Sequence, residues 1–372
     1  METENPADVV HLQSGRNHRS FCDLGHRGGE PSSPSSSSAF SNYSSDRSGE
    51  LHSTSVQGRR CASIPPTMIA SDSPDDGLIS QLVSDLASCS IDEQRLAVME
   101  IRLLAKKNNP DNRLRIAQAG AIKPLVSIIS STSDPLLQEY GVTAILNLSL
   151  CDENKEAIAA SGAIKPLVKV LRVGTPAAKE NAACALLHLS QMEENKAAIG
   201  RSGAIPLLVG LLEGGGPRGK KDAATALYLL CSLRENKVRA MQAGLMRTLV
   251  ELMADLDSIM VDKAAFVASV LVTGLEEARA ALVDEGGIPV LVEIVELGSQ
   301  RQKEIAVVML LELCEDNAIY RTMVAREGTV PPLVALSQTG TSRAKQKAEK
   351  LIELLRRRRT SDGGSAGSDV SL

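Results

Sequence analysis

Aromatic residues are scarce in this chain of 372 residues: they make up 2% of it, and tryptophan is absent. Hydrophobic residues nevertheless make up 43% of the sequence. The interior must therefore be built from Leu, Val, Ile and Ala, which are among the residues most often found fully buried. This composition suits closely stacked helices.

The chain also lacks an excess of positive charge, a long apolar run and a signal sequence. Its net charge is −4 and its pI about 5.9, which argues against a nucleic-acid binder that works by phosphate neutralisation. No apolar run reaches the length of a membrane span. The N-terminal residues 1–6 have neither the basic nor the apolar region of a signal peptide.

One motif recurs at a fixed period. Residues 161–168 read Ser-Gly-Ala-Ile-Lys-Pro-Leu-Val, and close copies stand at 119–126 and 202–209, with weaker copies further on. The glycines of the six copies are Gly120, Gly162, Gly203, Gly244, Gly286 and Gly328. Their successive differences are 42, 41, 41, 42 and 42 residues. Such a period predicts an array of stacked helical repeats.

Each repeat has three predicted helices. The glycine lies between two of them, where a sharp turn requires a positive φ. A proline follows in the first turn of the next helix, where its missing N–H costs least. These prolines are Pro124, Pro166, Pro206, Pro289 and Pro331. A short polar helix precedes the glycine and opens near Asp111, Glu153, Glu194 or Glu235, and a longer Ala/Leu-rich helix such as 176–189 ends the repeat.

One short and two longer helices in about 42 residues are typical of the armadillo repeat. The chain resembles armadillo-repeat proteins, and more closely the repeat region of plant U-box/armadillo ubiquitin ligases. The resemblance lies in residues 147–155 (Asn-Leu-Ser-Leu-Cys-Asp-Glu-Asn-Lys), 286–293 and 326–337, and it covers roughly 76–357. It implies an all-α fold, a right-handed α-solenoid of one partial and about six full repeats.

The predicted domains are a tail, the array and a second tail. Residues 1–75 are Ser-rich without helical or strand period and are predicted to be disordered, as is the Gly/Ser-rich segment 358–372. The partial repeat is expected at 76–87 and 91–106. The six fuller repeats begin near Asp111, Asp152, Glu193, Arg234, Glu276 and Asp316. The last helix, 342–359, is read as a basic terminal cap, and its four arginines at 356–359 also resemble a nuclear-localisation signal.

The N-terminal tail shows no U-box signature and no RING-type Cys/His spacing, so ligase activity of the chain by itself is not expected. Within this tail, Ser63 has Arg60 three residues before it and Pro65 two after it. This pattern resembles the phosphoserine motif that 14-3-3 adaptors bind, and a plain linker is the alternative.

Each candidate motif for enzymatic chemistry lacks residues that the chemistry requires. Residues 214–220 spell most of a phosphate loop, but Lys221 stands where Ser or Thr should meet Mg²⁺, and no strand precedes it. Of the five histidines only His188 lies in the array, so neither a metal site nor a catalytic triad is expected. The seven cysteines form no C-x-x-C pair, which favours reduced thiols in the cytoplasm or nucleus. No cofactor is expected.

The resemblance implies that the longest helix of each repeat lines a concave groove for an extended peptide, often with Trp and, four residues later, Asn. Alignment on the repeat openings gives the residues at the Trp position as Thr143, Cys184, Thr225, Phe266 and Ala306. Those at the Asn position are Asn147, His188, Leu229, Val270 and Leu310. One turn before the Trp position stand Tyr140, Asn181, Asp222, Lys263 and Lys303.

This groove is predicted to change from polar at 140–147 to apolar at 266–310, with Lys263 and Lys303 beside the apolar end. Phe266 is the predicted anchor for a partner, and ordinary packing between repeats is the alternative for it. Only Asn147 keeps the Asn of the family pattern, which argues against a carrier of basic localisation peptides similar to importin-α.

The sequence therefore predicts a non-enzymatic scaffold or adaptor that holds a peptide or helix of another protein in its groove. The resemblance implies a ubiquitin-linked setting, or stress or hormone signalling, in a plant. The alternative is a ubiquitin ligase, or its substrate-recognition component acting with a separate catalytic subunit.

Overall fold

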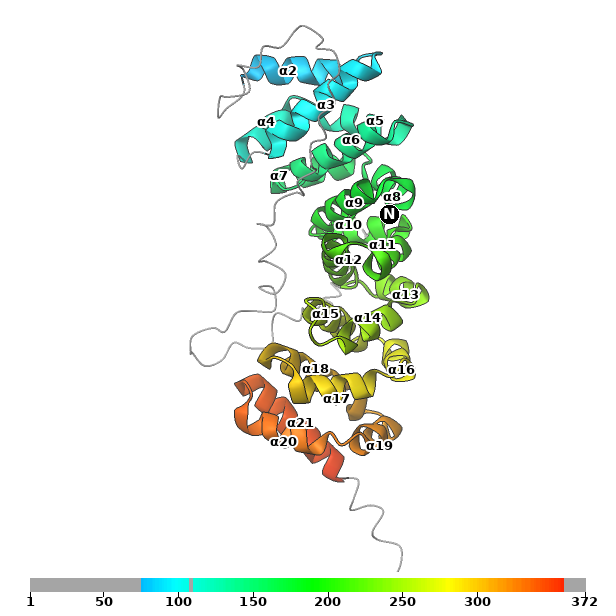
Figure 1. Ribbon diagram of the computed structural model, residues 1–372, viewed down its shortest axis with the longest axis vertical. Coiled ribbons are helices and arrows are strands. Elements are labelled where there is room, and N and C mark those ends of the chain that lie inside the picture. Colours follow the sequence, from blue (N-terminus) through cyan, green and yellow to red (C-terminus); the bar gives the residue numbers. More distant parts are fainter. Residues whose placement is uncertain (1–74, 107–109, 358–372) are drawn as a thin grey trace, which may run out of the picture. The chain divides into compact units, whose positions relative to one another are not determined.

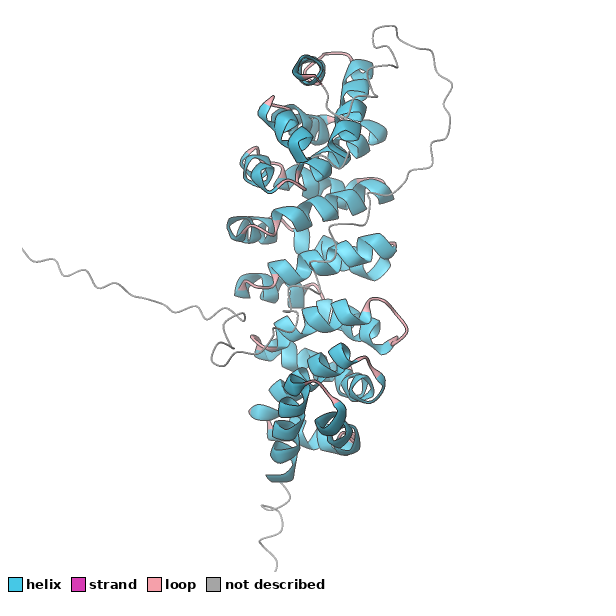
Figure 2. Ribbon diagram, turned by 90° about the vertical axis from the view of Figure 1, so that its left-hand side faces the viewer, coloured by secondary structure: helices cyan, strands magenta, loops and turns pink. Residues whose placement is uncertain are grey.

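The computed structural model describes residues 75–106 and 110–357. Within these ranges the chain folds into helices only, and twenty of them, α2 to α21, follow one another as stacked repeats (Figures 1 and 2). The predicted all-α array of one partial and six full repeats is confirmed. The tails predicted at 1–75 and 358–372, with Ser63, lie outside the described residues except for Asp75, which precedes α2.

Each full repeat has three helices, called H1, H2 and H3. The H1 helices are α4 (Pro110–Gln118), α7 (Asp152–Ala160), α10 (Glu193–Arg201), α13 (Arg234–Gln242), α16 (Glu276–Asp284) and α19 (Ala318–Arg326). The H2 helices are α5 (Ile122–Ser131), α8 (Ile164–Val173), α11 (Ala204–Gly214), α14 (Leu245–Ala254), α17 (Gly287–Leu297) and α20 (Val330–Thr339). The H3 helices are α6 (Pro135–Leu148), α9 (Pro176–Leu189), α12 (Pro217–Leu230), α15 (Val261–Val272), α18 (Gln300–Glu315) and α21 (Ser342–Arg357). The partial repeat supplies α2 (Asp76–Asp85) and α3 (Ile91–Lys106), which correspond to H2 and H3.

The turn between H1 and H2 depends on the repeated glycine. All six glycines have positive φ, from 75° at Gly286 to 93° at Gly120. Around Gly120 the Ala121 N–H donates to the Ile116 carbonyl at 3.3 Å, and the Gly120 N–H donates to Ala117 at 3.0 Å. This is a Schellman pair, which satisfies two carbonyls at the end of H1. The predicted roles of these glycines, and of the prolines in the first turn of H2, are confirmed.

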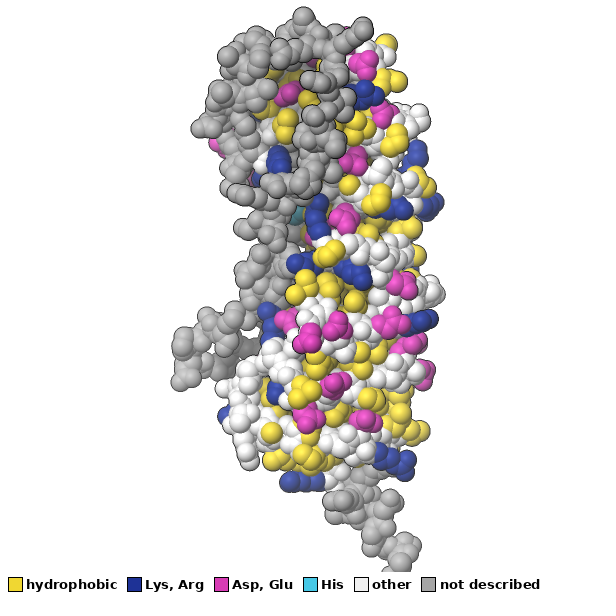
Figure 3. All heavy atoms as spheres, in the orientation of Figure 1, with side chains coloured by type: hydrophobic (Ala, Val, Ile, Leu, Met, Phe, Trp, Pro, Cys, Tyr) yellow, Lys and Arg dark blue, Asp and Glu magenta, His cyan; other side chains and the backbone are white. Residues whose placement is uncertain are grey.

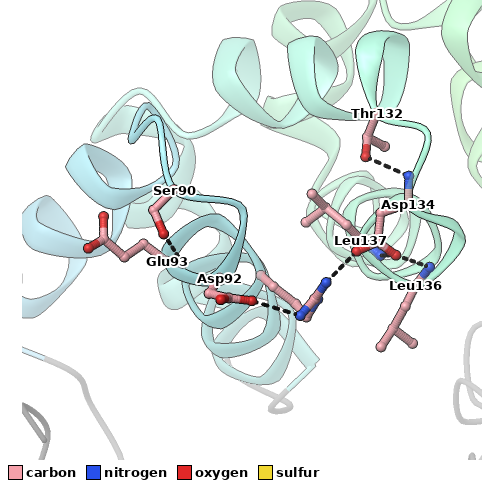
Figure 4. A network of polar contacts seen from close by, with 8 residues as sticks. Ser90, Asp92, Glu93, Thr132, Asp134, Leu136 and Leu137 are labelled. Atoms are coloured by element: carbon pink, nitrogen blue, oxygen red, sulfur yellow. Dashed lines mark hydrogen bonds and ion pairs between the residues drawn. The ribbon is translucent and has the colours of Figure 1, made fainter. Parts of the chain in front are cut away.

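The N-termini of the H3 helices are tied to the preceding repeat. Asp134, the N-cap of α6, accepts hydrogen bonds from the Leu136 and Leu137 N–H groups, and its carboxylate lies 2.6 Å from an Arg95 nitrogen on α3 (Figure 4). Likewise the Thr175 hydroxyl, which caps α9, donates to Glu139 on α6 at 2.6 Å. A side chain on each of these H3 helices thus fixes where the next one begins.

The glycine-rich segment 214–220 also ties the N-terminus of an H3 helix to the preceding repeat. It joins α11 to α12, as predicted, and Gly216 is the N-cap of α12 without a side chain to cap it. A Cβ at Gly216 would lie 2.8 Å from a Glu180 carboxylate oxygen, and one at Gly219 would lie 3.0 Å from it. The Glu180 carboxylate therefore lies against the N-terminus of α12, where the helix dipole favours negative charge.

The Asn–Lys openings of the H1 helices link each repeat to the preceding one and to the end of its own H3 helix. Asn236 donates from Nδ2 to the Leu230 carbonyl at the end of α12 and to the Lys196 carbonyl in the preceding H1, both at 3.0 Å. The following lysine, Lys237, donates from Nζ to the Val270 carbonyl on α15, in the same repeat, at 2.7 Å. In the fifth repeat Arg279 stands in the lysine's place and reaches back to Val272 at 3.1 Å.

Candidate protein-binding surface

The candidate surface, called the H3 surface, consists of the half-buried and exposed side chains of α3, α6, α9, α12, α15 and α18. Its register is set by buried residue pairs near the ends of these helices, such as Leu271–Val272 in α15 and Leu313–Cys314 in α18. Leu313 and Cys314 in α18 therefore correspond to Leu271 and Val272 in α15. By the same offset, Val308 corresponds to Phe266, and Glu312 corresponds to Val270. Both are half-buried.

This register corrects the prediction for α18. Ala306 and Leu310 are each 0% exposed, so they belong to the core. Thr143 lies 32 residues after its repeat opening, Asp111, and Phe266 lies 32 residues after Arg234. The same offset from Glu276 gives Val308, so Ala306 and Leu310 are two residues out of register. Val308 and Glu312 replace Ala306 and Leu310 on the surface, and Lys303 remains half-buried.

The other predicted groove residues fall into two groups. The half-buried group, which remains accessible on the H3 surface, consists of Tyr140, Cys184, His188, Asp222, Leu229, Phe266 and Val270. The buried group consists of Thr143, Asn147, Asn181, Thr225 and Lys263, all less than 9% exposed. The roles of these residues in binding stay predictions.

The centre of the H3 surface, on α6 to α15, is linked by a series of hydrogen bonds between successive repeats, called the ladder. The Asn181 amide donates to the Thr143 hydroxyl at 2.9 Å. The Lys263 ammonium donates to the Thr225 hydroxyl at 3.1 Å, two repeats further along. Each hydroxyl in turn donates to the carbonyl four residues earlier, at 2.7 Å for Thr143 and 2.8 Å for Thr225.

Between these two links, Cys184 and Asp222 make the corresponding contact. Cys184 and Asp222 lie close enough to influence each other's charge, and burial raises the pKa of both groups. Arg218 opposes the shift of Asp222, because its Nε lies 3.7 Å from the carboxylate. Three successive repeats thus pair the residue at the Trp position with the residue one turn before it in the next repeat.

Lys263 is therefore an internal residue. Burial lowers its pKa from 10.5 to about 8, although the negative charge of Asp222 acts in the opposite direction. Its side chain is 6% exposed. The prediction that Lys263 presents a cation beside the apolar end is wrong, because its ammonium is directed to Thr225 within the ladder.

Asn147 is also engaged within the fold. Its Nδ2 donates to the Arg102 carbonyl on α3 at 3.0 Å. This bond joins the partial repeat to the first full repeat, so the one Asn that keeps the family position serves packing between repeats in this structure.

His188 is held neutral at the centre of the H3 surface. Burial, with the nearby positive charge of Lys155, lowers its pKa from 6.5 to about 4. Lys155 itself is buried and hydrogen-bonds the Asp152 carboxylate and the Gln191 amide oxygen. The centre therefore contains several polar groups, and many of them form hydrogen bonds with other groups of the same chain.

The two flanks of the H3 surface each carry an arginine over an aromatic ring. The Arg102 guanidinium lies 4.8 Å from the centre of the Tyr140 ring, between α3 and α6. The Arg301 guanidinium lies 4.8 Å from the centre of the Phe266 ring, between α18 and α15. Both distances are within the range of cation–π attraction. The sequence analysis did not identify either arginine. The available signal for Arg301 is its place in the first turn of an H3 helix, directly after Gln300.

Large apolar side chains accompany both rings. Near Tyr140, α3 and α6 expose Leu96 (50%), Leu103 (38%) and Leu136 (45%). Near Phe266, Ile259 is 65% exposed in the segment before α15. The predicted change from polar to apolar along the groove therefore needs revision, because α3 adds a second apolar region at the N-terminal end.

The described surface outside the H3 helices carries charges of both signs. On the face shown in Figure 3, Lys and Arg alternate with Asp and Glu. Within the described ranges, no three His, Cys, Asp or Glu side chains are grouped so that they could hold a metal ion. No single described helix is long and apolar enough to cross a membrane; α10 and α11 pass such a test only as a pair, bent by 85°.

Comparison with known proteins agrees with this architecture. Residues 78–364 match the family described as the plant U-box protein armadillo-repeat region. U-box domain-containing protein 4 of Arabidopsis thaliana is 58% identical over 267 residues, 72% of this chain and 32% of that protein. U-box domain-containing protein 2 of the same plant is 55% identical over 248 residues, 67% of this chain and 35% of its own length. The chain thus spans about a third of these curated relatives.

Solved structures show the same fold. The crystal structure of an engineered protein superposes with a TM-score of 0.66 at 26% sequence identity, covering 76% of this chain and 68% of its own. A second engineered protein gives a TM-score of 0.56 at 28% identity, covering 63% of this chain and 96% of its own.

Proposed function

This chain belongs to the family of plant U-box protein armadillo-repeat regions, and we propose from that premise that it is a protein-interaction scaffold whose H3 surface holds a segment of a partner protein. The H3 helices are the elements that present a run of aligned side chains across every repeat. A partner segment lying along them would contact each repeat in turn.

The observation that carries this proposal is the exposure of large apolar side chains on the H3 surface. Leu96 and Leu103 are exposed on α3 and Leu136 on α6, the two helices that carry Arg102 and Tyr140. Ile259 is exposed in the segment before α15, which carries Phe266. Neighbouring apolar side chains left in water mark interaction sites more often than scattered single ones do. Aromatic and arginine side chains, which both regions contain, dominate the energetics of protein interfaces.

Site-specific photo-crosslinking tests the proposal. A photoreactive amino acid is placed at Leu229, on the H3 surface, and in a second variant at Val173, which is 65% exposed on the H2 helix α8. After incubation in plant extract, we expect a discrete crosslinked partner from position 229 and none from position 173. Crosslinking of the same partner from 173 but not from 229 would contradict the proposal.

A substrate-recognition role in ubiquitin transfer is the second candidate. A rice relative, 52% identical over 75 residues, is named E3 ubiquitin-protein ligase SPL11. Those 75 residues are 20% of this chain and 10% of the relative, and the family match concerns the repeat region. We expect the purified chain to form no ubiquitin chains with E1 and E2 enzymes, and to enhance substrate modification only with a separate ligase subunit.

Two further proposals do not depend on the H3 surface: a phosphorylation site at Ser63, and a location of the protein in the cytoplasm or nucleus. A phosphorylated peptide of residues 58–68 is expected to bind a 14-3-3 protein, while the unmodified peptide does not. Equal binding of both peptides, or of neither, would count against this site.

A further inference from the structure

Two arginine–aromatic pairs stand on the H3 surface of a chain that has few aromatic residues. The aromatic residues within the described ranges are Tyr140, Tyr228, Phe266 and Tyr320. Two of these four rings lie under a guanidinium at the same distance, 4.8 Å, one near each end of the H3 surface. Stacking on a ring fixes the plane of an arginine and leaves its N–H groups pointing along the surface.

These two arginines differ from others on the H3 helices. Arg95, Arg218 and Arg343 have carboxylate partners at 2.6, 3.7 and 3.5 Å. Among the described residues, no carboxylate lies within ion-pair distance of the Arg102 or Arg301 guanidinium. The Nε of Arg102 is a buried donor without a hydrogen-bond partner, but so is the Nε of Arg95, so the difference lies in the carboxylate partners alone.

From this difference we propose that the two pairs, Arg102 with Tyr140 and Arg301 with Phe266, are twin anchor points for one extended, acidic and apolar segment of a partner protein. At each point a carboxylate of the segment would pair with the guanidinium in a bidentate contact. An apolar side chain next to it would lie on the ring and on the neighbouring leucines or isoleucine. This inference rests on the proposed function of the H3 surface.

The arrangement of helices sets the spacing of the two anchors. Tyr140 is on α6 and Phe266 on α15, three H3 steps apart. Packed helices lie about 8–10 Å apart, which gives roughly 24–30 Å between the anchors. An extended chain rises about 3.3 Å per residue, so the two acidic–apolar units are expected roughly seven to nine residues apart.

The region between the anchors suits a polar spacer. Its polar side chains form the ladder of Thr143 with Asn181 and of Thr225 with Lys263, and His188 is held neutral. Small or amide-bearing spacer residues can accept or donate beside these bonds without displacing them.

A selection from a display library of random 16-residue peptides, against the full chain, tests the inference. Enriched sequences are expected to carry two acidic–apolar units seven to nine residues apart. Binding of a synthetic peptide with such a sequence is expected to weaken about tenfold in Arg102→Gln and in Arg301→Gln. Arg201→Gln, at an exposed arginine on the H1 helix α10, is the matched control and should bind as the unaltered chain does.

The outcomes separate the two levels of the proposal. The twin-anchor inference would be overturned by enriched peptides that carry a single acidic–apolar unit, another spacing between units, or basic residues. The proposed function would survive this result if the Phe266→Ala substitution still abolished binding of those peptides. Peptides that bind equally well to Phe266→Ala and Tyr140→Ala would overturn both. Both would also be overturned by a selection that enriches only peptides that the heat-unfolded chain enriches as well.

Discussion

The centre and the flanks of the H3 surface use their polar side chains differently. At the centre, Thr143 and Thr225 are each hydrogen-bonded by a residue from the following repeat. At the flanks, Arg102 and Arg301 lie on aromatic rings and have no carboxylate partner among the described residues. The difference teaches that one continuous surface can combine a part that holds the repeats together with parts available for a partner. Substitutions at the centre should therefore change stability, and those at the flanks should change binding.

The largest effect is expected for Lys263→Glu. This substitution places a second carboxylate in a buried site beside Asp222, whose pKa burial already raises, and it removes the donor to Thr225. Leaving a buried charge uncompensated costs about 3–5 kcal/mol of unfolding free energy. Urea unfolding would measure it.

Lys303→Glu is the matched control for this prediction. Lys303 is half-buried, less so than Lys263, and donates to the Glu296 carbonyl at 2.8 Å, so its loss should cost less than about 1 kcal/mol. Equal losses for Lys263→Glu and Lys303→Glu would contradict the assignment of Lys263 to the interior.

A smaller effect, dependent on pH, is expected from His188. Its pKa is about 4 in the folded chain and 6.5 in its ordinary state, so below pH 6.5 the unfolded chain binds more protons than the folded one. Stability is therefore lost as the pH falls from about 6.5 towards 4. His188→Leu should remove this loss, which amounts to about 2 kcal/mol at pH 4.5.

Leucine is a suitable replacement, because Leu229 occupies the corresponding position one repeat later. Urea unfolding of both forms at pH 7 and pH 4.5 gives the comparison. If His188→Leu loses as much stability between the two pH values as the unaltered chain, the neutral, buried histidine is not the source of the acid sensitivity.

The ladder at the centre predicts a coupling of about 1–2 kcal/mol between Thr225 and Lys263. Thr225→Val leaves the Lys263 ammonium without its hydroxyl acceptor at 3.1 Å, which should cost about that much stability. In the Thr225→Val/Lys263→Met double variant the buried ammonium that lost its hydroxyl acceptor is gone, so most of the stability should return. A double-mutant cycle measures the coupling. Additive losses in the two single variants would show that the bond contributes nothing.

Much of the architecture could be predicted because it depends on local backbone chemistry. The glycines needed a positive φ, and all six have one. The helix predicted at 176–189 forms with those bounds, because Pro176 starts it after the N-cap Thr175 and Leu189 ends its apolar pattern.

The candidate site was predicted less well, because it depends on register and on contacts between repeats. The predicted Ala306 and Leu310 are two residues out of register on α18, and their complete burial shows that both belong to the core. Lys263 reads as a surface cation, since a sequence does not show that Thr225 lies within reach of its ammonium. The aromatic partners of Arg102 and Arg301 lie 38 and 35 residues away in sequence, and only the stacking of repeats brings them together.

The smallest change in stability, and the most direct test of the account, belongs to Arg301→Gln at the flank. Unfolding free energy and the Kd for the crosslinked partner segment would be measured on the same preparation. The account predicts a change in unfolding free energy below about 1 kcal/mol, as for an exposed cation–π pair, with a Kd that rises about tenfold. A clear fall in unfolding free energy with an unchanged Kd would show that Arg301 only packs the repeats and that the partner binds elsewhere.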